Sequence, residues 1–268
     1  MKPYPTKNTN LYKFEILEQY HEVRHFVTGR IGGFSKGNYK GLNLGFGTDD
    51  DPEIIIKNRY ALTEDLGIPL EWFVFMRQTH SSNIEVVDFS QRGYGAFSRE
   101  NAIANTDAII TSGKNICLVV QVADCVPLLL LDSNNGVIAA IHAGWRGTFQ
   151  EITRLTIEKM VSEFNSNPTD IIACIGPSIG PCCYETGNEI REQFLQKNER
   201  YSEIFFHKNN KLILDLWKAN KIQLLAAGVK EQNIEVSNLC TSCNHNLFYS
   251  SRFDKGNTGR FVAGIMLQ

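Results

Sequence analysis

Apolar and polar positions along the chain follow helical spacing in a few segments. Residues 52–66 carry apolar side chains that would share one helix face. Asp51 suits the N-cap, Pro52 the first helical position and Gly67 the C-terminal end. The pattern therefore predicts a helix over 52–66.

Three further helices are predicted in the second half of the chain. One begins at Thr148, where Glu151 three residues later would complete a capping box. The others cover residues 188–197 and 217–227, the last one closed by Gly228.

Short apolar runs bounded by polar turns predict strands. They cover residues 72–77, 84–89, 106–111, 116–122, 127–132, 137–141, 171–175, 212–216, 248–253 and 261–267. The glycine-rich segment 24–47 indicates turns and close backbone approaches, in a structured functional loop or a linker.

The strands outnumber the helices and do not alternate regularly with them, which predicts an α+β fold. No linker composition interrupts the chain, so we expect a single domain over 1–268. No glycine-rich dinucleotide loop, phosphate-binding P-loop or nucleophile elbow follows a predicted strand. Those three function classes lack support.

Charge and composition argue against binding to nucleic acid or to a membrane. The net charge is −2 and the isoelectric point about 6.3, so no global field favours nucleic acid or an anionic membrane. No uninterrupted apolar stretch reaches the roughly 20 residues that span a bilayer. The first ten residues lack the apolar region of a secretory signal. We therefore expect a cytoplasmic protein whose seven cysteines are reduced thiols.

Three potential metal ligands end or interrupt apolar strands. Cys125 lies 45 residues after His80, and His142 lies 17 residues after Cys125. Two imidazoles and one thiolate suit Zn²⁺ with a fourth position open to water, as in catalytic zinc sites. Side chains of these types also serve packing or hydrogen bonding, and the spacing alone does not separate the two interpretations.

The segment after His142 suits an anion. Gly144 and Gly147 permit close backbone approach, Arg146 supplies a planar charged fork, and the helix predicted from Thr148 would offer free amides. A phosphate could bind there beside a metal. Alternatively, Arg146 pairs with a carboxylate and the glycines only turn the chain.

Two cysteine pairs remain. Cys240 and Cys243 form a CxxC with His245 close behind, but no second CxxC exists, so structural or incidental thiols are favoured. Adjacent Cys182 and Cys183 do not easily ligate one metal together. We therefore interpret them as part of a turn packed near the core.

Taken together, several segments resemble one family. They are TGRIGGFSKGNYKGLNLGFGTDDDP (28–52), RQTHS (77–81), NTDAIIT (105–111), VADCVPLLL (122–130), AAIHAGWRGT (139–148), IGPSIGPCCYETG (175–187) and CTSCNHNLFYSSRFDKGNTGR (240–260). In this order they resemble the laccase-domain, YfiH-like family of purine nucleoside phosphorylases, earlier labelled polyphenol oxidases.

The resemblance implies a layered α/β sandwich with mixed sheets. It also implies one zinc ion per chain bound by His80, Cys125 and His142, which would be both metal ligands and catalytic residues. The implied activities are phosphorolysis of adenosine, inosine, guanosine and methylthioadenosine, and deamination of adenosine. The implied partners are thus a purine nucleoside and phosphate.

Substrate-binding candidates follow from this hypothesis. Arg146 is the first candidate for phosphate and Arg30 the second, and Asn43 is a candidate for the sugar or base. In deamination, with zinc activating the attacking water, Asp124 is a candidate proton carrier.

Three alternatives stay open. A copper-dependent polyphenol oxidase needs paired His-x-His motifs, and none of the six histidines forms one. A cysteine hydrolase would use Cys125 as nucleophile and His142 as base. A non-enzymatic reading is a metal-binding partner of cell-wall or division proteins.

Overall fold

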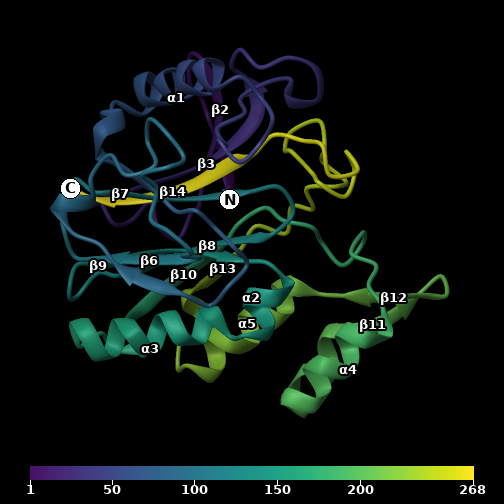
Figure 1. The fold of residues 1–268 in the computed structure, drawn as a ribbon. Coiled ribbons are helices and arrows are strands. Elements are labelled where there is room, and N and C mark those ends of the chain that lie inside the picture. The colour runs from purple at the N-terminus through teal and green to yellow at the C-terminus, as the bar shows by residue number, and fades with distance from the viewer.

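Two six-stranded mixed sheets stacked face to face form the centre of the molecule (Figure 1). The computed structural model describes all residues 1–268. The first sheet has the order β1 (Lys2–Tyr4), β2 (Thr9–Lys13), β3 (Val23–Gly32), β14 (Phe261–Leu267), β7 (Cys117–Val122) and β4 (Phe73–Phe75). The second has the order β13 (Ile234–Val236), β10 (Ile171–Ile175), β8 (Val126–Asp132), β9 (Val137–Ala143), β6 (Ala108–Thr111) and β5 (Ile84–Val86).

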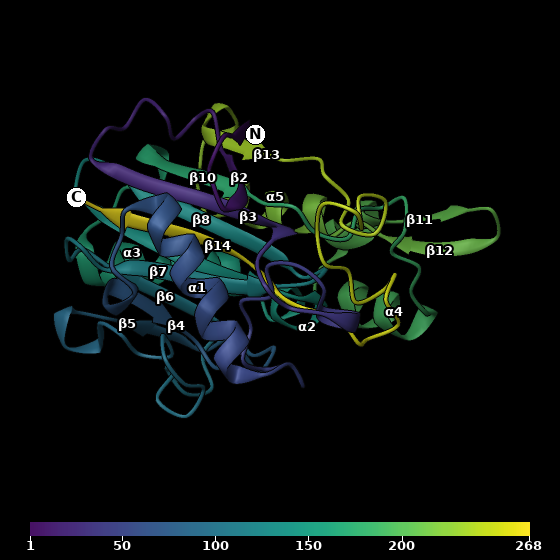
Figure 2. The same ribbon diagram turned by 90° about the horizontal axis from the view of Figure 1, so that it is seen from above.

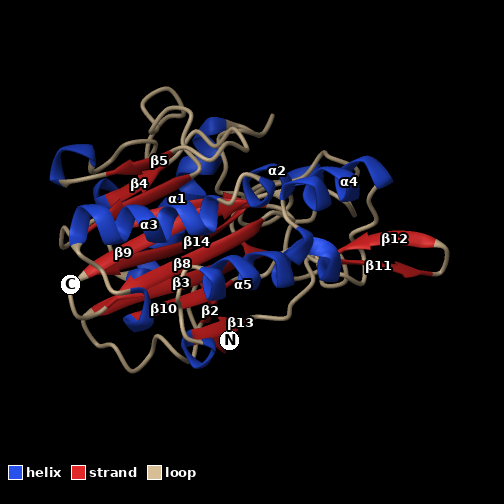
Figure 3. Cartoon of the chain, turned by 90° about the horizontal axis from the view of Figure 1, so that it is seen from below, coloured by secondary structure: helices blue, strands red, loops and turns tan.

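Helices cover the outer face of each sheet. α1 (Pro52–Leu66) packs over the first sheet, and α3 (Ile152–Phe164) and α5 (Leu216–Ala226) pack over the second (Figures 1 and 3). The remaining α-helices and strands are the short α2 (Trp145–Phe149), α4 (Asn188–Lys197) and the hairpin of β11 (Phe205–Lys208) and β12 (Lys211–Leu214). Six short 3-10 helices lie in the connections. The hairpin projects from one end of the sandwich (Figure 2). None of the helices combines the length and the apolar content that crossing a bilayer requires.

The central strands are buried on both faces, which explains their continuous apolar runs. In β7, Leu118 and Val120 point into the core between the two sheets, whereas Cys117 and Val119 point into the core beneath α1. Parallel pairs (β4 with β7, β5 with β6, β10 with β13) occur among antiparallel ones. The α+β class, and the layered sandwich of mixed sheets that the resemblance implied, are confirmed.

The predicted helix over 52–66 is confirmed with its capping residues. The Glu53 amide donates to the Asp51 carboxylate at 2.9 Å. Gly67 adopts the left-handed conformation at φ 59° and ends the helix. Helices at 188–197 and 216–226 also match their predictions.

The capping box predicted at Thr148 is wrong. Thr148 lies inside α2, and its amide already donates to the Gly144 carbonyl at 2.8 Å. Glu151 instead adopts φ 64°, which separates α2 from α3. The five-residue α2 therefore offers no free amides at Thr148 for an anion.

Two further predictions are also wrong, the loop or linker over 24–47 and the strand over 248–253. Part of the glycine-rich segment is the ten-residue strand β3, which pairs with β2 and β14. Residues 248–253 form turns and no strand. Phe248 and Tyr249 are fully buried there, so their apolar signal comes from packing beneath a loop.

Two connections cross from the first sheet to the second at the same end. β4 and β7 are parallel neighbours in the first sheet, and the chain after each continues into the second sheet as β5 and β8. The β4–β5 crossing contains His80, and the β7–β8 crossing contains Cys125. The topology thus brings together two residues 45 positions apart.

His25 in β3 links the N-terminal segment to the sheet. Its Nε2 accepts the Phe14 amide at 3.0 Å, and burial lowers its pKa to about 4. The folded protein therefore holds this imidazole neutral while the unfolded chain protonates near 6.5. The contribution of His25 to the stability of the fold is therefore complete above pH 6.5, and it is lost as the pH falls toward about 4.

We expect His25→Gln to flatten the pH dependence of unfolding. In the wild-type chain, protonation of this residue on unfolding should lower the unfolding free energy by about 2.5 kcal/mol between pH 7.5 and 4.5. Urea titrations at several pH values measure that slope. The exposed His21→Gln is the control and should keep it. An unchanged slope in His25→Gln would contradict the assignment.

Candidate active site

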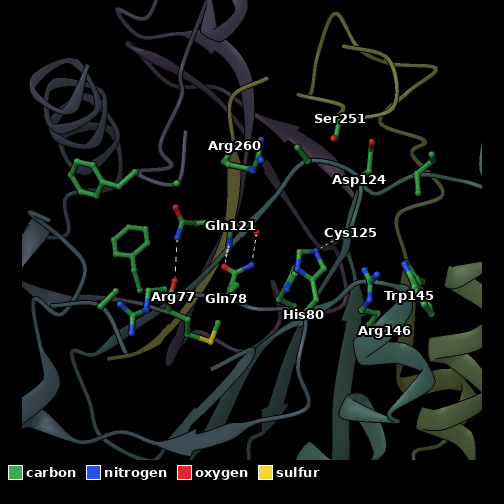
Figure 4. A pocket seen from close by; sticks show the side chains of 18 of the residues that line it. Arg77, Gln78, His80, Gln121, Asp124, Cys125, Trp145, Arg146, Ser251 and Arg260 are labelled. Atoms are coloured by element: carbon green, nitrogen blue, oxygen red, sulfur yellow. Dashed lines mark hydrogen bonds between the residues drawn. The ribbon is translucent and has the colours of Figure 1, made fainter. Parts of the chain in front are cut away.

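A cavity of about 630 Å³ opens at the end of the sandwich where the two crossings lie. His80, Cys125 and His142 all line it, as do residues of α2 and of the turns before β14 (Figure 4). Its volume lies within the range of small-molecule sites. The structure thus places the three sequence-predicted ligands in the wall of one pocket.

The three ligands converge on one point. His80 Nε2 lies 3.6 Å from Cys125 Sγ. The rings of His80 and His142 lie 4.8 Å apart between centroids. One donor atom from each of the three residues lies within 4.8 Å of the others.

The donor spacing fits a tetrahedral ion. Bond lengths of about 2.3 Å to sulfur and 2.0–2.1 Å to nitrogen place neighbouring donors about 3.6 Å apart. Two imidazoles and one thiolate match the ligand types of Zn²⁺ and leave a fourth position toward the cavity. The residues present therefore fit a bound metal.

Gly144 allows this convergence because it has no side chain. A Cβ at this position would lie 2.9 Å from His80 Cδ2 and 3.0 Å from Cys125 Sγ. Both distances are too short for carbon and sulfur. The glycine next to β9 is thus required by the close approach of two ligands.

Asp107 is fully buried and holds both histidines. Its carboxylate accepts hydrogen bonds from the amides of Thr79, His80 and Ser81, at 2.8–3.1 Å. It also accepts His142 Nδ1–H at 2.7 Å, which leaves Nε2 as the ligand atom. These bonds fix His80 at φ 61°, a strained conformation for a residue other than glycine.

The ionised groups support one another electrostatically. Burial alone would raise the pKa of Asp107, but His142 and Ser81 lower it well below its usual range. Burial alone would also raise the pKa of Cys125, yet His142 and His80 lower it. The Cys125 thiolate, the form that binds metals, is therefore favoured near neutral pH.

Basic side chains dominate the lining of the cavity. Seven cations contribute to it and only one carboxylate, Asp124. The cations are Arg59, Arg77, Arg99, Arg146, Arg252, Lys255 and Arg260. In a chain of net charge −2, this local excess creates a site for an anion.

Arg146 is free to bind such an anion. Its guanidinium stacks over the Trp145 ring at 4.4 Å and has no carboxylate within ion-pair distance. The alternative of a carboxylate partner is therefore wrong. Arg77 also lines the cavity without a side-chain partner, and the two arginines lie on either side of His80 (Figure 4).

The other two substrate-binding candidates do not line the cavity. Arg30 donates to the His245 carbonyl at 2.8 Å and lies 3.7 Å from Asp254. Asn43 is fully buried, and its Oδ1 accepts the Arg260 amide at 2.8 Å. Asn43 therefore affects the cavity only indirectly, because it positions the backbone of Arg260, which lines it.

Asp124 is oriented by its neighbours rather than free in the cavity. Its two carboxylate oxygens accept hydrogen bonds from Thr241 Oγ1 and from the Arg252 amide, both at 2.6 Å. Its φ of 97° shows that the turn before Cys125 is strained. These contacts favour a positioning role over proton transfer.

Sequence reasoning missed Asp107 and Gln78. Gln78 donates to the Gln121 carbonyl at 2.7 Å and accepts its amide at 2.9 Å, so the cavity wall is tied to β7 (Figure 4). A carboxylate at the start of an apolar strand was the available signal for Asp107. No pattern indicated the partner of Gln78.

Known proteins are similar to this chain over nearly its whole length. A family model described as "Multi-copper polyphenol oxidoreductase laccase" matches residues 24–268. The chain belongs to this laccase-domain, YfiH-like family. A relative from Bacteroides thetaiotaomicron named "Purine nucleoside phosphorylase" is 37% identical over 98% of both chains. "Adenosine deaminase RL5", from an unknown prokaryotic organism, is 35% identical over 95% of this chain and 98% of its own.

Solved structures of the YfiH-like family have the same fold. YlmD from Geobacillus stearothermophilus has a TM-score of 0.93 and 34% identity over 99% of this chain and 98% of its own. The hypothetical protein YfiH from Bacillus licheniformis has a TM-score of 0.92 and 33% identity over 97% of both chains.

The copper chemistry in the family description lacks ligands in this chain. Only His80 and His142 occur in a group that could hold a metal. His25 hydrogen-bonds to Phe14, and His245 stacks on Phe253 at 3.5 Å between centroids. A three-copper cluster needs several histidines gathered in one place, and these are dispersed.

We expect Asp107→Asn to lower metal affinity about 10- to 100-fold. The neutral side chain no longer holds the His142 tautomer, and its NH2 group faces backbone amides that are also hydrogen-bond donors. Metal titration against a competing chelator measures this. Asp132→Asn, a buried carboxylate at the far end of β8, controls for lost stability. Equal affinities in both variants would contradict the role of Asp107.

We expect Gly144→Ala to lower metal affinity about tenfold or more, since its methyl group displaces His80 or Cys125. Gly47→Ala is the control, because a Cβ there meets nothing within 4 Å. Metal content after dialysis compares the two. Full retention of metal by Gly144→Ala would show that the close approach is not required.

Proposed function

We propose that this chain is a zinc-dependent purine nucleoside phosphorylase that also deaminates adenosine. One observation carries the proposal: a cavity rich in cations surrounds the converging His80, Cys125 and His142. The names of two relatives in the family support the same two activities. We expect the reaction to take place in the cytoplasm.

Phosphate is assigned to the cations beside His80. Arg146 presents an unpaired guanidinium, whose planar fork suits two phosphate oxygens. Arg77 supplies a second free charge from the other side. Phosphate held between them would attack C1′ of the ribose as the glycosidic bond breaks, and its negative charge would stabilise the cationic sugar.

The purine is assigned to the aromatic part of the lining. Phe46, Trp145 and Tyr184 contribute aromatic surface to the cavity wall, against which a planar base would pack. The cavity volume accommodates a nucleoside together with phosphate. We propose adenosine, inosine, guanosine and methylthioadenosine as substrates.

His80, Cys125 and His142 would hold one zinc ion. When bound, zinc would act as a Lewis acid toward an oxygen ligand and would activate water for attack on purine C6 in deamination. Asp107 keeps His142 in the ligating tautomer, and Gln78 fixes the adjoining wall.

A cysteine hydrolase is the second candidate, because a thiolate close to two imidazoles also suits a nucleophile with its base. Alkylation separates the two. A metal-bound Cys125 should resist iodoacetamide until a chelator is added, whereas a free nucleophile should react at once.

We expect Arg146→Gln to raise the KM for phosphate about 10- to 100-fold, because a charge-assisted hydrogen-bond pair is lost. Arg146→Lys should recover only part of that loss, since lysine lacks the fork. Metal content should not change. The exposed Arg191→Gln on α4 is the control. An unchanged KM for phosphate would contradict the assignment.

The direct test is incubation of the pure chain with adenosine and phosphate. We expect adenine, inosine from the deaminase activity, and ribose 1-phosphate in an amount equal to adenine plus any hypoxanthine released from that inosine. Chelation should abolish all three products, and added zinc should restore them. Full turnover by the metal-free chain, or ribose release without any need for phosphate, would contradict the proposal.

A further inference from the structure

Four cysteines outside the cavity gather at one place. Cys182 and Cys183 lie between β10 and α4, and Cys240 and Cys243 lie between β13 and β14. Cys243 Sγ is 3.4 Å from the sulfurs of both Cys182 and Cys183. All four sulfurs lie within 4.8 Å of one another.

This finding corrects the interpretation of both motifs from the sequence. The adjacent cysteines were expected to pack near the core, yet Cys182 is exposed and Cys183 half-buried. The turn at 181–183, closed by the Cys183 amide donating to the Gly180 carbonyl, directs both sulfurs toward Cys243. The CxxC pair, Cys240 and Cys243, therefore lies beside a second pair of thiols, which is formed by adjacent cysteines and not by another CxxC.

The geometry favours a shared ion over a disulfide. A disulfide joins two sulfurs at about 2.05 Å. Cys243 is equally distant from two partners, so no pair is singled out. Four thiolates around one Zn²⁺ at about 2.3 Å lie about 3.8 Å from one another, which falls within the observed spread.

The surroundings also suit bound thiolates. The Gly180 amide donates to Cys240 Sγ at 3.3 Å. No carboxylate or imidazole belongs to the group, so the ligand set is purely sulfur. Such a set selects a thiophilic ion, and four protein ligands leave no open position, as in structural zinc sites.

We propose that Cys182, Cys183, Cys240 and Cys243 bind a second, structural Zn²⁺. It joins two chain segments about 60 residues apart, and Ile179 and Tyr184, which flank the segment with the adjacent cysteines, line the cavity. Thr241, between two of the ligands, donates to Asp124 beside Cys125. Arg252 donates to the Cys183 carbonyl at 3.1 Å and lines the cavity. The proposal does not depend on which reaction the cavity performs.

Zinc content per chain tests the proposal. We expect two zinc ions in the wild-type chain by native mass spectrometry and elemental analysis, and one in Cys243→Ser. Cys125→Ser, which loses the cavity ligand, should also retain one. Cys174→Ala, a buried thiol outside both groups, is the control and should retain two. This count separates the second site from the proposed activity, because Cys125→Ser is expected to be inactive.

A second measurement covers the case in which Cys243→Ser does not fold. In zinc-loaded Cys125→Ser, alkylation followed by peptide mapping should find all four cysteines protected until a strong chelator is added. Chelation should also lower the melting temperature. Equal zinc in wild-type and Cys243→Ser chains, iron in place of zinc, or a disulfide among the four in freshly isolated protein would overturn the proposal.

Discussion

The arrangement of the active site depends on the buried carboxylate of Asp107. It binds the backbone of the turn that carries His80 and, at the same time, the imidazole of His142. One charged group thus sets the position of one ligand and the tautomer of another. The cost of burying this charge is offset by the number and the short lengths of its hydrogen bonds. Without these hydrogen bonds, nothing would offset the backbone strain of His80 at its positive φ.

The sheets supply the second requirement, a rigid frame for the ligands. Parallel β4 and β7 end side by side, and the chain after each crosses to the second sheet. His80 and Cys125 lie in those crossings, and His142 comes from β9 within the second sheet. Gly144 then permits contact distances that any other residue would prevent. The basic side chains around the cavity make it locally positive, although the protein as a whole is nearly neutral, and so favour an anion there.

Local sequence patterns predicted many of the helices and strands but few of the long-range contacts between them. Capping residues located α1 because Asp51 and Gly67 act within a few residues of the chain. β3 was missed because its glycines, which allow loops to approach, resemble a turn-rich segment. The helix at Thr148 was misplaced because Glu151 bends the backbone instead of capping it. The three candidate metal ligands were selected by residue type and by resemblance, and the structure brings them together. Asp107 and the gathering of four cysteines depend on long-range contacts that no spacing encodes.

In the proposed active site, one metal ion and one phosphate share the cavity beside His80. A crystal of the chain soaked in zinc and phosphate, with anomalous data collected at the zinc edge, tests this most directly. We expect an anomalous peak within bonding distance of His80 Nε2, Cys125 Sγ and His142 Nε2, and phosphate on Arg146. A site without a peak among these three residues, or phosphate bound only outside the cavity, would contradict it.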